Sequence, residues 1–408
     1  MQQKILQGDF DKQRAYIDLV KKINEDKKNL TGKTPVVCVK TFGCQQNVAD
    51  SEKIKGIASS MGYVIDENIE NADFVIYNTC AVRENAEDRV FGNTGMLKKL
   101  KKNNPNMVIG LCGCMMQQQH IVKKIKQSYP QVDLIMGTHS LHLLPQLLYK
   151  ILDGKTKVID IEDRDGIFPE GLPILRDEKD HAWVPIMYGC DNFCTYCIVP
   201  YVRGRERSRK SIDVINEVKT LVNNGYKKIT LLGQNVNSYG KGLEEKINFN
   251  NLLRKINEIP GKFEVGFMTS HPKDCSKELI DTISECDKIS KHLHLPVQCG
   301  SDRILKLMNR KYTINEYKNL IDYAKEKING LILSTDIIVG FPGETYEDFV
   351  KTKEIVEYVK YDFLYTFIYS RRVGTVAADM KDFVSSEEKH KWFDELLKLQ
   401  EDIKSKKI

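Results

Sequence analysis

Three cysteines in one short segment have the clearest spacing for chemistry in this sequence. Cys190, Cys194 and Cys197 form a Cys-x3-Cys-x2-Cys pattern directly after a β-rich run at residues 184–188. This spacing brings three thiolates around one inorganic centre. If the run is a strand of a parallel α/β sheet, the cysteines lie at its carboxyl end, where such proteins carry out their chemistry.

Two inorganic centres compete for these three thiolates. A structural zinc ion prefers four ligands, usually from two knuckles of Cys-x2-Cys type. No fourth Cys or His lies in an adjacent knuckle, and the nearest histidine, His181, precedes the strand. Three thiolates suit a 4Fe–4S cluster in which one iron has no protein ligand. The spacing therefore favours an iron–sulfur cluster, with zinc as the alternative.

A second group of cysteines lies in the first third of the chain. Each follows a predicted strand and precedes a predicted helix: Cys44, Cys80 and either Cys112 or Cys114. In a doubly wound sheet the carboxyl ends of the strands face one edge, so these thiols converge although they are far apart in sequence. Helix amino termini also favour the thiolate form that binds metal. Taken singly, each would be interpreted as a buried free cysteine; together they predict a second metal centre.

Composition limits the class of protein and its surroundings. The chain has 408 residues, 41% hydrophobic and 29% charged, with a net charge of +6. These values are typical of a soluble globular protein, and the charge is compatible with a polyanionic partner without requiring one. The sequence contains no run of 18 or more apolar residues, so it predicts no membrane-spanning helix. The first residues also lack the apolar core of a secretory signal. We therefore expect a cytoplasmic protein.

The high cysteine content supports the metal interpretation in that compartment. The sequence has 11 cysteines, and a reducing compartment disfavours disulfides, so clustered cysteines indicate metal binding or catalysis. The four outside the two groups have no mutual spacing and are expected to be structural: Cys38, Cys275, Cys286 and Cys299.

The alternation of β-rich and helical runs predicts an α/β fold with two domains. In residues 35–152 the strands alternate with helices, which predicts a doubly wound parallel sheet. Residues 183–408 contain six strand–helix units and a closing helix, short of the eight units of a closed barrel, and predict a partial (β/α)6 barrel. Residues 1–34 are expected to form an N-terminal extension, and residues 153–182 a linker.

Further strand-end loops in the second domain carry glycines or charges. Gly340 and Gly343 permit close backbone approach by a ligand, although a bare β–α turn has the same residues. The loop at residues 230–240 ends another predicted strand. Four arginines directly follow the first cysteine group, where they are expected to contact a nucleic-acid backbone unless they form an ordinary solvated face; they are Arg203, Arg205, Arg207 and Arg209.

The first cysteine group, with Tyr196 just before its third cysteine, resembles the signature of the radical S-adenosylmethionine (SAM) superfamily. The resemblance implies that SAM chelates the open iron and is cleaved by electron transfer to a 5′-deoxyadenosyl radical. It also implies a partial barrel. The strand-end loops match the family's cofactor-lining segments, which makes five residues cofactor-binding candidates: Tyr196, Gly233, Gln234, Gly340 and Gly343.

The strings TFGCQQNVADS, YNTCAVRENAEDRVFG and GCMMQ resemble the amino-terminal domain of methylthiotransferases. This resemblance implies an auxiliary 4Fe–4S cluster on Cys44, Cys80 and Cys114, rather than Cys112, which holds or supplies the inserted sulfur. The implied cofactors are thus two 4Fe–4S clusters and SAM, which serves as radical source and methyl donor. The six cysteines are the expected catalytic and metal-binding residues.

Within this family the chain is most similar to members that act on N6-isopentenyladenosine next to the anticodon of tRNA and convert its carbon 2 from C–H to C–SCH3. The implied partners are the tRNA anticodon stem-loop and an electron donor such as flavodoxin or ferredoxin, with the enzyme a monomer. Family members that modify threonylcarbamoyl-adenosine or a ribosomal-protein aspartate are the nearest alternatives. A non-catalytic iron–sulfur or zinc protein that binds RNA is the alternative from another class.

The resemblance also predicts a difference from relatives at the carboxyl end. Relatives commonly carry a small all-β RNA-binding module, the TRAM domain, after the barrel. Here about 40 residues follow Tyr369, and their apolar spacing predicts a single amphipathic helix, too little chain for such a module. We therefore expect the chain to lack it.

Overall fold

The computed structural model describes residues 2–82, 84–154, 156–162 and 170–406. The chain divides into two compact units. Unit 1 comprises Met1–Lys179 together with Tyr201–Gly204, and unit 2 comprises Asp180–Pro200 and Arg205–Ile408. Residues 155 and 163–169, in the segment predicted as a linker, lie outside the described residues.

Unit 1 is built on a parallel sheet. Its described strands follow the order β2-β1-β3-β4-β5-β6, and every neighbouring pair is parallel. The strands are β1 (Val36–Phe42), β2 (Val64–Ile65), β3 (Phe74–Thr79), β4 (Val108–Gly113), β5 (Leu134–Met136) and β6 (Val158–Asp160). The strand β2 lies on one side of β1, and the next strand along the chain, β3, lies on the other side of β1. The carboxyl ends of β1 and β3 therefore form the switch point at which open α/β sheets place their sites.

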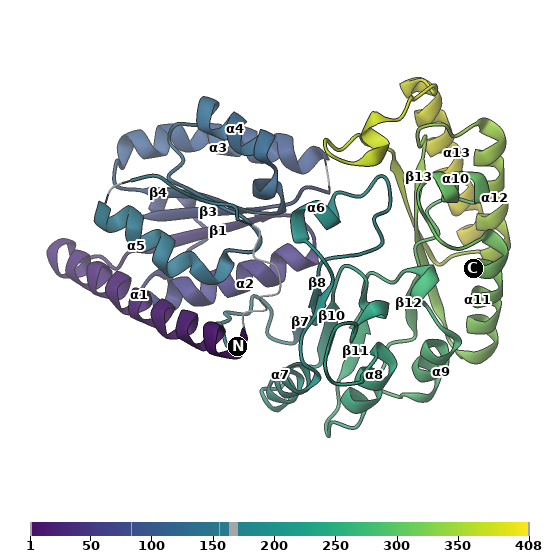
Figure 1. Cartoon of the computed structure of the whole chain (residues 1–408), viewed down its shortest axis with the longest axis horizontal. Coiled ribbons are helices and arrows are strands. Elements are labelled where there is room, and N and C mark those ends of the chain that lie inside the picture. Colours follow the sequence, from purple (N-terminus) through teal and green to yellow (C-terminus); the bar gives the residue numbers. More distant parts are fainter. Residues whose placement is uncertain (1, 83, 155, 163–169, 407–408) are drawn as a thin grey trace. The chain divides into compact units, whose positions relative to one another are not determined.

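Helices cover both faces of this sheet because alternate strand residues point to opposite sides. Val37 packs in one apolar core with α2 (Gln45–Ser60) and α5 (Leu144–Gly154), whereas Cys38 packs in the other core with α3 (Glu84–Asn103) and α4 (Gln119–Ser128). The long helix α1 (Gln2–Thr31) packs on α5, as Figure 1 shows. The described part of the segment predicted as an N-terminal extension thus belongs to unit 1.

Unit 2 contains two parallel three-stranded sheets among its described residues. Their orders are β11-β10-β7 and β12-β13-β14. The strands are β7 (His181–Pro185), β10 (Lys228–Leu232), β11 (Glu264–Phe267), β12 (His292–His294), β13 (Ile332–Val339) and β14 (Phe363–Ile368). A parallel bridge between Val265 and Ile289 links β11 to the segment before β12. The predicted fold class, a doubly wound sheet followed by a partial (β/α)6 barrel, is confirmed.

Helices alternate with these strands and share one apolar core with them. They are α7 (Ser211–Asn223), α8 (Phe249–Asn257), α9 (Lys277–Glu285), α11 (Ile314–Lys327), α12 (Tyr346–Val359) and α13 (Ser386–Ser405). The last three each begin with a capping box, in which a Thr or Ser and an acidic residue three positions later satisfy the first backbone N–H groups. None of the described helices combines the length and apolar character needed to cross a bilayer.

Candidate functional site

Three thiols converge at the switch point of unit 1. Cys44 follows β1 at the start of α2, Cys80 follows β3, and Cys114 follows β4. The interaction between the Cys44 and Cys80 thiols lowers the pKa of Cys44 and raises that of Cys80. The nearby Cys114 raises the pKa of Cys80 further through its charge. The edge therefore holds three sulfurs that act electrostatically on one another.

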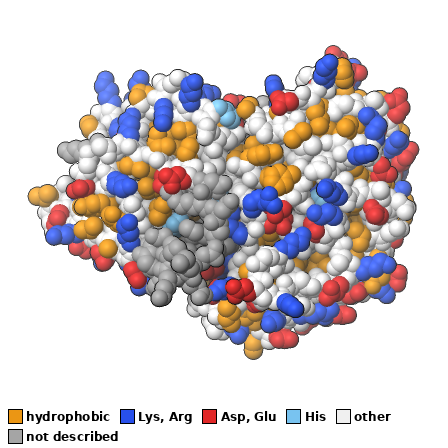
Figure 2. Space-filling view, in the orientation of Figure 1, with side chains coloured by type: hydrophobic (Ala, Val, Ile, Leu, Met, Phe, Trp, Pro, Cys, Tyr) orange, Lys and Arg blue, Asp and Glu red, His pale blue; other side chains and the backbone are white. Residues whose placement is uncertain are grey.

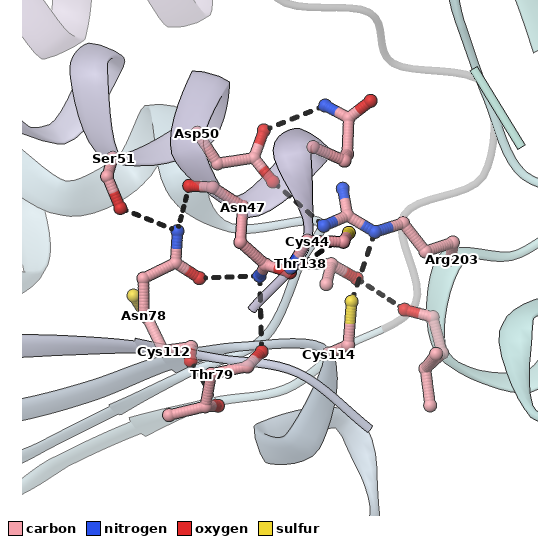
Figure 3. A network of polar contacts seen from close by, with 12 residues as sticks. Cys44, Asn47, Asp50, Ser51, Asn78, Thr79, Cys112, Cys114, Thr138 and Arg203 are labelled. Atoms are coloured by element: carbon pink, nitrogen blue, oxygen red, sulfur yellow. Dashed lines mark hydrogen bonds and ion pairs between the residues drawn. The ribbon is translucent and has the colours of Figure 1, made fainter. Parts of the chain in front are cut away.

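Two buried asparagines hold the loops that carry Cys44 and Cys80. The Asn47 side-chain amide donates to Asn78 Oδ1 at 2.9 Å and to the Thr79 carbonyl at 3.2 Å, and the Asn78 amide donates to the Asn47 carbonyl at 2.8 Å. Asn78 also donates to Ser51 at 3.0 Å (Figure 3). Because these bonds join the start of α2 to the end of β3, they fix the spacing of the two thiols.

Gly113 controls the approach of the third thiol. Its φ of 95° lies in the left-handed region, and a Cβ there would stand 2.5 Å from the Thr79 carbonyl oxygen. The backbone can turn from β4 toward Cys114 only without a side chain at this position.

Replacement Gly113→Ala should therefore destabilise unit 1 by about 1–3 kcal/mol and lower the iron bound at the Cys44 group, since strain and the clash displace Cys114. Thermal unfolding should show a decrease of about 2–4 °C in Tm for each kcal/mol. Gly92→Ala is the matched control, because Gly92 lies in α3 with open space where its Cβ would stand. A Gly113→Ala protein as stable and iron-rich as Gly92→Ala would contradict this role.

Cys112 and Cys114 lie in different surroundings. The Cys112 side chain packs in the apolar core beneath α2 and α5, and burial raises the pKa of its thiol. The Cys114 sulfur accepts a hydrogen bond from Arg203 Nε at 3.1 Å. Cys114 also interacts electrostatically with Cys80 and with Cys44. Burial raises the pKa of Cys114 as well, and the Arg203 guanidinium opposes that shift. Of the two, Cys114 thus has a cationic hydrogen-bond donor at its sulfur.

In unit 2 the three cysteines of the first group also lie together. Cys190, Cys194 and Cys197 follow a short strand, β8 (Met187–Tyr188). The Cys197 amide donates to the Cys194 carbonyl at 2.9 Å, which folds the loop back on itself. Burial raises the pKa values of Cys190 and Cys197 to about 12, and the charge of Cys194 adds to both shifts. As free thiols Cys190 and Cys197 are therefore protonated at neutral pH, so a cationic centre would have to displace their protons.

Arg310 contacts this first group, a role that the sequence pattern did not indicate. Its Nη1 donates to the Cys194 sulfur at 3.6 Å, and its Nη2 donates to the Pro296 carbonyl at 2.8 Å. Its Nε donates to the Tyr312 hydroxyl at 3.1 Å. Arg310 lies 116 positions after Cys194 in a segment without any glycine-rich or cysteine signal, so only the fold brings the two together.

The two donor sets have the chemistry of iron–sulfur ligands. Among the described residues, no three His, Cys, Asp or Glu side chains gather closely enough to bind a single metal ion. Each group offers thiols alone, which is the ligand type that such clusters use.

Three of the cofactor-binding candidates, Gly233, Gln234 and Tyr196, lie close to the cysteine loop. Gln234 Oε1 accepts a hydrogen bond from the Gly189 amide at 2.6 Å and so ties the loop after β10 to the cysteine loop. A Cβ on Gly233 would stand 2.5 Å from Cγ of Met187, so this glycine allows the loop after β10 to approach the strand that leads into the cysteine loop. The half-buried Tyr196 packs against the apolar core of unit 2.

The loop after β13 requires its glycines for backbone reasons. Gly340 and Gly343 have φ values of 69° and 86°. The space beside Gly340 is filled by Lys389 of α13, whereas a Cβ on Gly343 would make an ordinary van der Waals contact with Leu307 at 3.6 Å. Glu344 accepts a hydrogen bond from the Phe341 amide at 3.0 Å, and burial raises the pKa of its carboxyl group to about 7.

The four candidate arginines occupy two kinds of environment. Arg203 and Arg209 are buried, and Arg209 pairs with Glu217 at 2.6 Å. The Arg205 side chain is 66% exposed beside Asp191, and Arg207 is half-buried over the Tyr188 ring. The structure therefore places only part of the predicted charge run in contact with solvent.

Comparison with known proteins agrees with this geometry. Residues 184–356 match the radical SAM superfamily, and residues 36–137 match a family described as uncharacterized protein family UPF0004. TsrM of Kitasatospora setae, a radical S-adenosylmethionine methyltransferase, aligns with 84% of this chain and 75% of its own at a TM-score of 0.60 and 12% identity, which shows a shared fold. The fold and the cysteine loop thus define a radical SAM protein.

Closer relatives identify the family within that class. The tRNA-2-methylthio-N(6)-dimethylallyladenosine synthase of Acetivibrio thermocellus is 54% identical over 97% of this chain and 82% of its own length. The synthase of that name from Clostridioides difficile is 53% identical over 94% of this chain and 80% of its own. The chain belongs to the family of tRNA-2-methylthio-N(6)-dimethylallyladenosine synthases. Membership implies a 4Fe–4S cluster and SAM as cofactors.

Proposed function

We propose that this chain converts N6-isopentenyladenosine next to the anticodon of tRNA into its 2-methylthio derivative. The observation that carries the proposal is the presence of two separate thiol groups, one in each unit. A single group would suffice for radical generation alone. A second group at the switch point of unit 1 supports sulfur insertion as a separate task. The relatives are identical to this chain at more than half of the aligned positions, and their names support the same substrate.

We assign one cofactor site to each domain that the sequence predicts. In residues 183–408, Cys190, Cys194 and Cys197 would hold the cluster that binds SAM. In residues 35–152, Cys44, Cys80 and Cys114 would hold the auxiliary cluster. When bound, the two clusters supply a low-potential electron beside an open coordination position and a site for the inserted sulfur.

The chain's own residues prepare the SAM site in two ways. Cys190 and Cys194 are less than one-tenth exposed, so water has little access to reactive species beside them. Arg310 places a fixed positive charge next to Cys194, which offsets the negative charge of bound thiolates. We assign SAM contacts to the surrounding loops, through Tyr196, Gly233, Gln234, Gly340 and Gly343.

Among the arginines, we propose Arg205 and Arg207 as the contacts to the tRNA backbone. On the face of the molecule in Figure 2, basic and acidic side chains are interspersed, so net charge alone does not mark an RNA-binding surface there. Arg205 and Arg207 follow the cysteine loop and reach solvent. Arg203 and Arg209, which we also expected near the RNA, are buried with carboxylate partners.

Replacing Arg205 and Arg207 by Ala should weaken tRNA binding and make it less dependent on salt. The log–log slope against salt concentration should fall by about 0.7–0.9 for each phosphate that the variant no longer neutralises. Filter binding at several salt concentrations measures the slope. Arg254→Ala is the control, because Arg254 of α8, whose side chain is 40% exposed, pairs with Glu285. Equal slopes for the double variant and the control would remove these arginines from the interface.

The proposed reaction is tested with the anaerobically reconstituted full chain, SAM, a reductant and anticodon stem-loops. One stem-loop carries N6-isopentenyladenosine, and a second carries threonylcarbamoyl-adenosine. We expect the methylthio product only from the first, detected by mass spectrometry of nucleosides. Product from the second stem-loop alone would assign the chain to the alternative substrate. We further propose a flavodoxin or ferredoxin as electron donor, a monomeric enzyme and a cytoplasmic location.

A further inference from the structure

Arg203 belongs to a short segment that lies in unit 1, although the chain before and after this segment belongs to unit 2. The segment Tyr201–Gly204 packs in unit 1, whereas Asp180–Pro200 before it and the chain from Arg205 onward belong to unit 2. The Arg203 side chain is only 5% exposed. A long charged side chain is rarely buried to this extent unless it is paired, so its partners indicate its role.

Both ends of the Arg203 guanidinium have a defined partner (Figure 3). Its Nε donates to the Cys114 sulfur at 3.1 Å. Its Nη2 lies 2.9 Å from Asp50 Oδ2, and the Asp50 side chain is 10% exposed. Gln46 donates to the other oxygen of Asp50 at 3.2 Å. The planar, forked guanidinium group of Arg203 thus joins a carboxylate of α2 to the sulfur of a proposed cluster ligand.

The backbone next to Arg203 is also fixed. The Thr138 hydroxyl donates to the Val202 carbonyl at 2.6 Å, from the loop that follows β5. Arg203 is therefore anchored in unit 1 through its main chain as well as its side chain. An arginine held at two points keeps one donor aimed at one sulfur, which a freely rotating surface arginine does not do.

Hydrogen bonds to the sulfurs and nearby charge set the reduction potential of an iron–sulfur cluster. Reduction adds one negative charge to the cluster and its thiolates. A buried cation that donates to a ligand sulfur stabilises this extra charge more than it stabilises the oxidised form, because the surrounding dielectric is low. Asp50 opposes this effect with its own charge while it orients the guanidinium.

We propose that Arg203 is a positioning residue of the auxiliary centre that raises its reduction potential by donating to Cys114, with Asp50 as the opposing and orienting partner. This inference rests on the proposed function, because it requires the cluster of Cys44, Cys80 and Cys114. It gives Arg203 a role distinct from the RNA contact that its position in a run of arginines suggests.

The test uses the full chain with Cys190, Cys194 and Cys197 replaced by Ala, so that only the auxiliary cluster gives a signal. Reduction by dithionite is followed by electron paramagnetic resonance at set potentials. In this parent, Arg203→Met should make the equilibrium constant for one-electron reduction about tenfold smaller, a midpoint lower by about 59 mV. Asp50→Asn, which removes a negative charge at nearly constant shape, should raise the midpoint.

Arg176→Met is the matched control. Arg176 pairs with Glu52 of the same helix α2 at 2.7 Å, with side chains 10% and 1% exposed. Like Arg203→Met, the Arg176→Met variant removes a buried ion pair on α2. The partner of Arg176, however, is a carboxylate and not a cluster ligand. The reduction midpoint of this variant should therefore equal that of the parent. A midpoint shift in Arg176→Met as large as that in Arg203→Met would make the effect structural and overturn the inference.

The two substitutions at the Arg203 pair keep the inference falsifiable. An unchanged midpoint in Arg203→Met overturns it, as does a midpoint in Asp50→Asn at or below that of the parent. If Arg203→Met binds no cluster, Arg203→Lys takes its place, because it keeps the charge but not the planar fork that reaches Asp50 and Cys114 together. Its midpoint should be lower than that of the parent, and an unchanged midpoint contradicts the role of the fork. A parent that binds no cluster at all would instead refute the proposed function.

Discussion

Replacing Cys190, Cys194 and Cys197 together by Ala should remove about half of the iron from the reconstituted protein and abolish cleavage of SAM. We expect about eight irons and about eight sulfides per chain before the replacement, from two 4Fe–4S clusters with three cysteine ligands each. The remaining half belongs to the thiols of unit 1, which lie on a different sheet and whose loops are held by the Asn47–Asn78 hydrogen bonds. Iron and sulfide analysis, together with 5′-deoxyadenosine production, measures both effects.

A matched control is available within unit 2. Cys275 and Cys286 are buried, and they lie outside both thiol groups. Their replacement by Ala should leave the iron content and the cleavage of SAM unchanged, apart from some decrease in stability. Stoichiometric zinc without iron–sulfur absorption in the unmodified chain would contradict the assignment of both groups.

Replacing Cys80 or Cys114 by Ala should separate radical generation from sulfur insertion. Such a variant retains the SAM cluster and should still cleave SAM reductively, but it should form no methylthio product. The reason is that the auxiliary cluster, held by three thiolates, is left with only two of them. Simultaneous measurement of 5′-deoxyadenosine and of methylthio nucleosides tests this separation.

Cys112→Ala is the matched control for Cys114→Ala. Cys112 is only two positions away, but its side chain packs in an apolar core, whereas the Cys114 sulfur accepts from Arg203. The Cys112→Ala variant should therefore keep its auxiliary iron and its product. Depletion of that iron in Cys112→Ala, together with its retention in Cys114→Ala, would reverse the ligand assignment.

The sequence predicted the fold well because its signals are local. Strands such as β1 and β3 are short apolar runs bounded by polar residues, and their alternation with helices indicates parallel pairing. The convergence of Cys44 and Cys80 follows from the same signals, since the residues after β1 and β3 meet at the switch point of the sheet. These features depend on position along a strand and on sheet order.

Interactions made by long polar side chains were not predictable in this way. Arg203 belongs to a run in which every second residue is an arginine, a pattern typical of a solvated face, yet it is buried against Asp50 and Cys114. Arg310 reaches Cys194 across 116 positions. Each interaction depends on the route of the backbone and on a paired partner, and neither leaves a periodic signal in the sequence.

Mass analysis of tRNA nucleosides tests the central claim most directly. The full chain and its Cys114→Ala variant are expressed in a bacterial strain whose own synthase gene is deleted, and the modified adenosines of total tRNA are quantified. The unmodified chain should restore 2-methylthio-N6-isopentenyladenosine, while the Cys114→Ala variant should leave N6-isopentenyladenosine without the methylthio group. Absence of the methylthio nucleoside with the unmodified, iron-loaded chain, or its appearance on threonylcarbamoyl-adenosine instead, would contradict the proposed function.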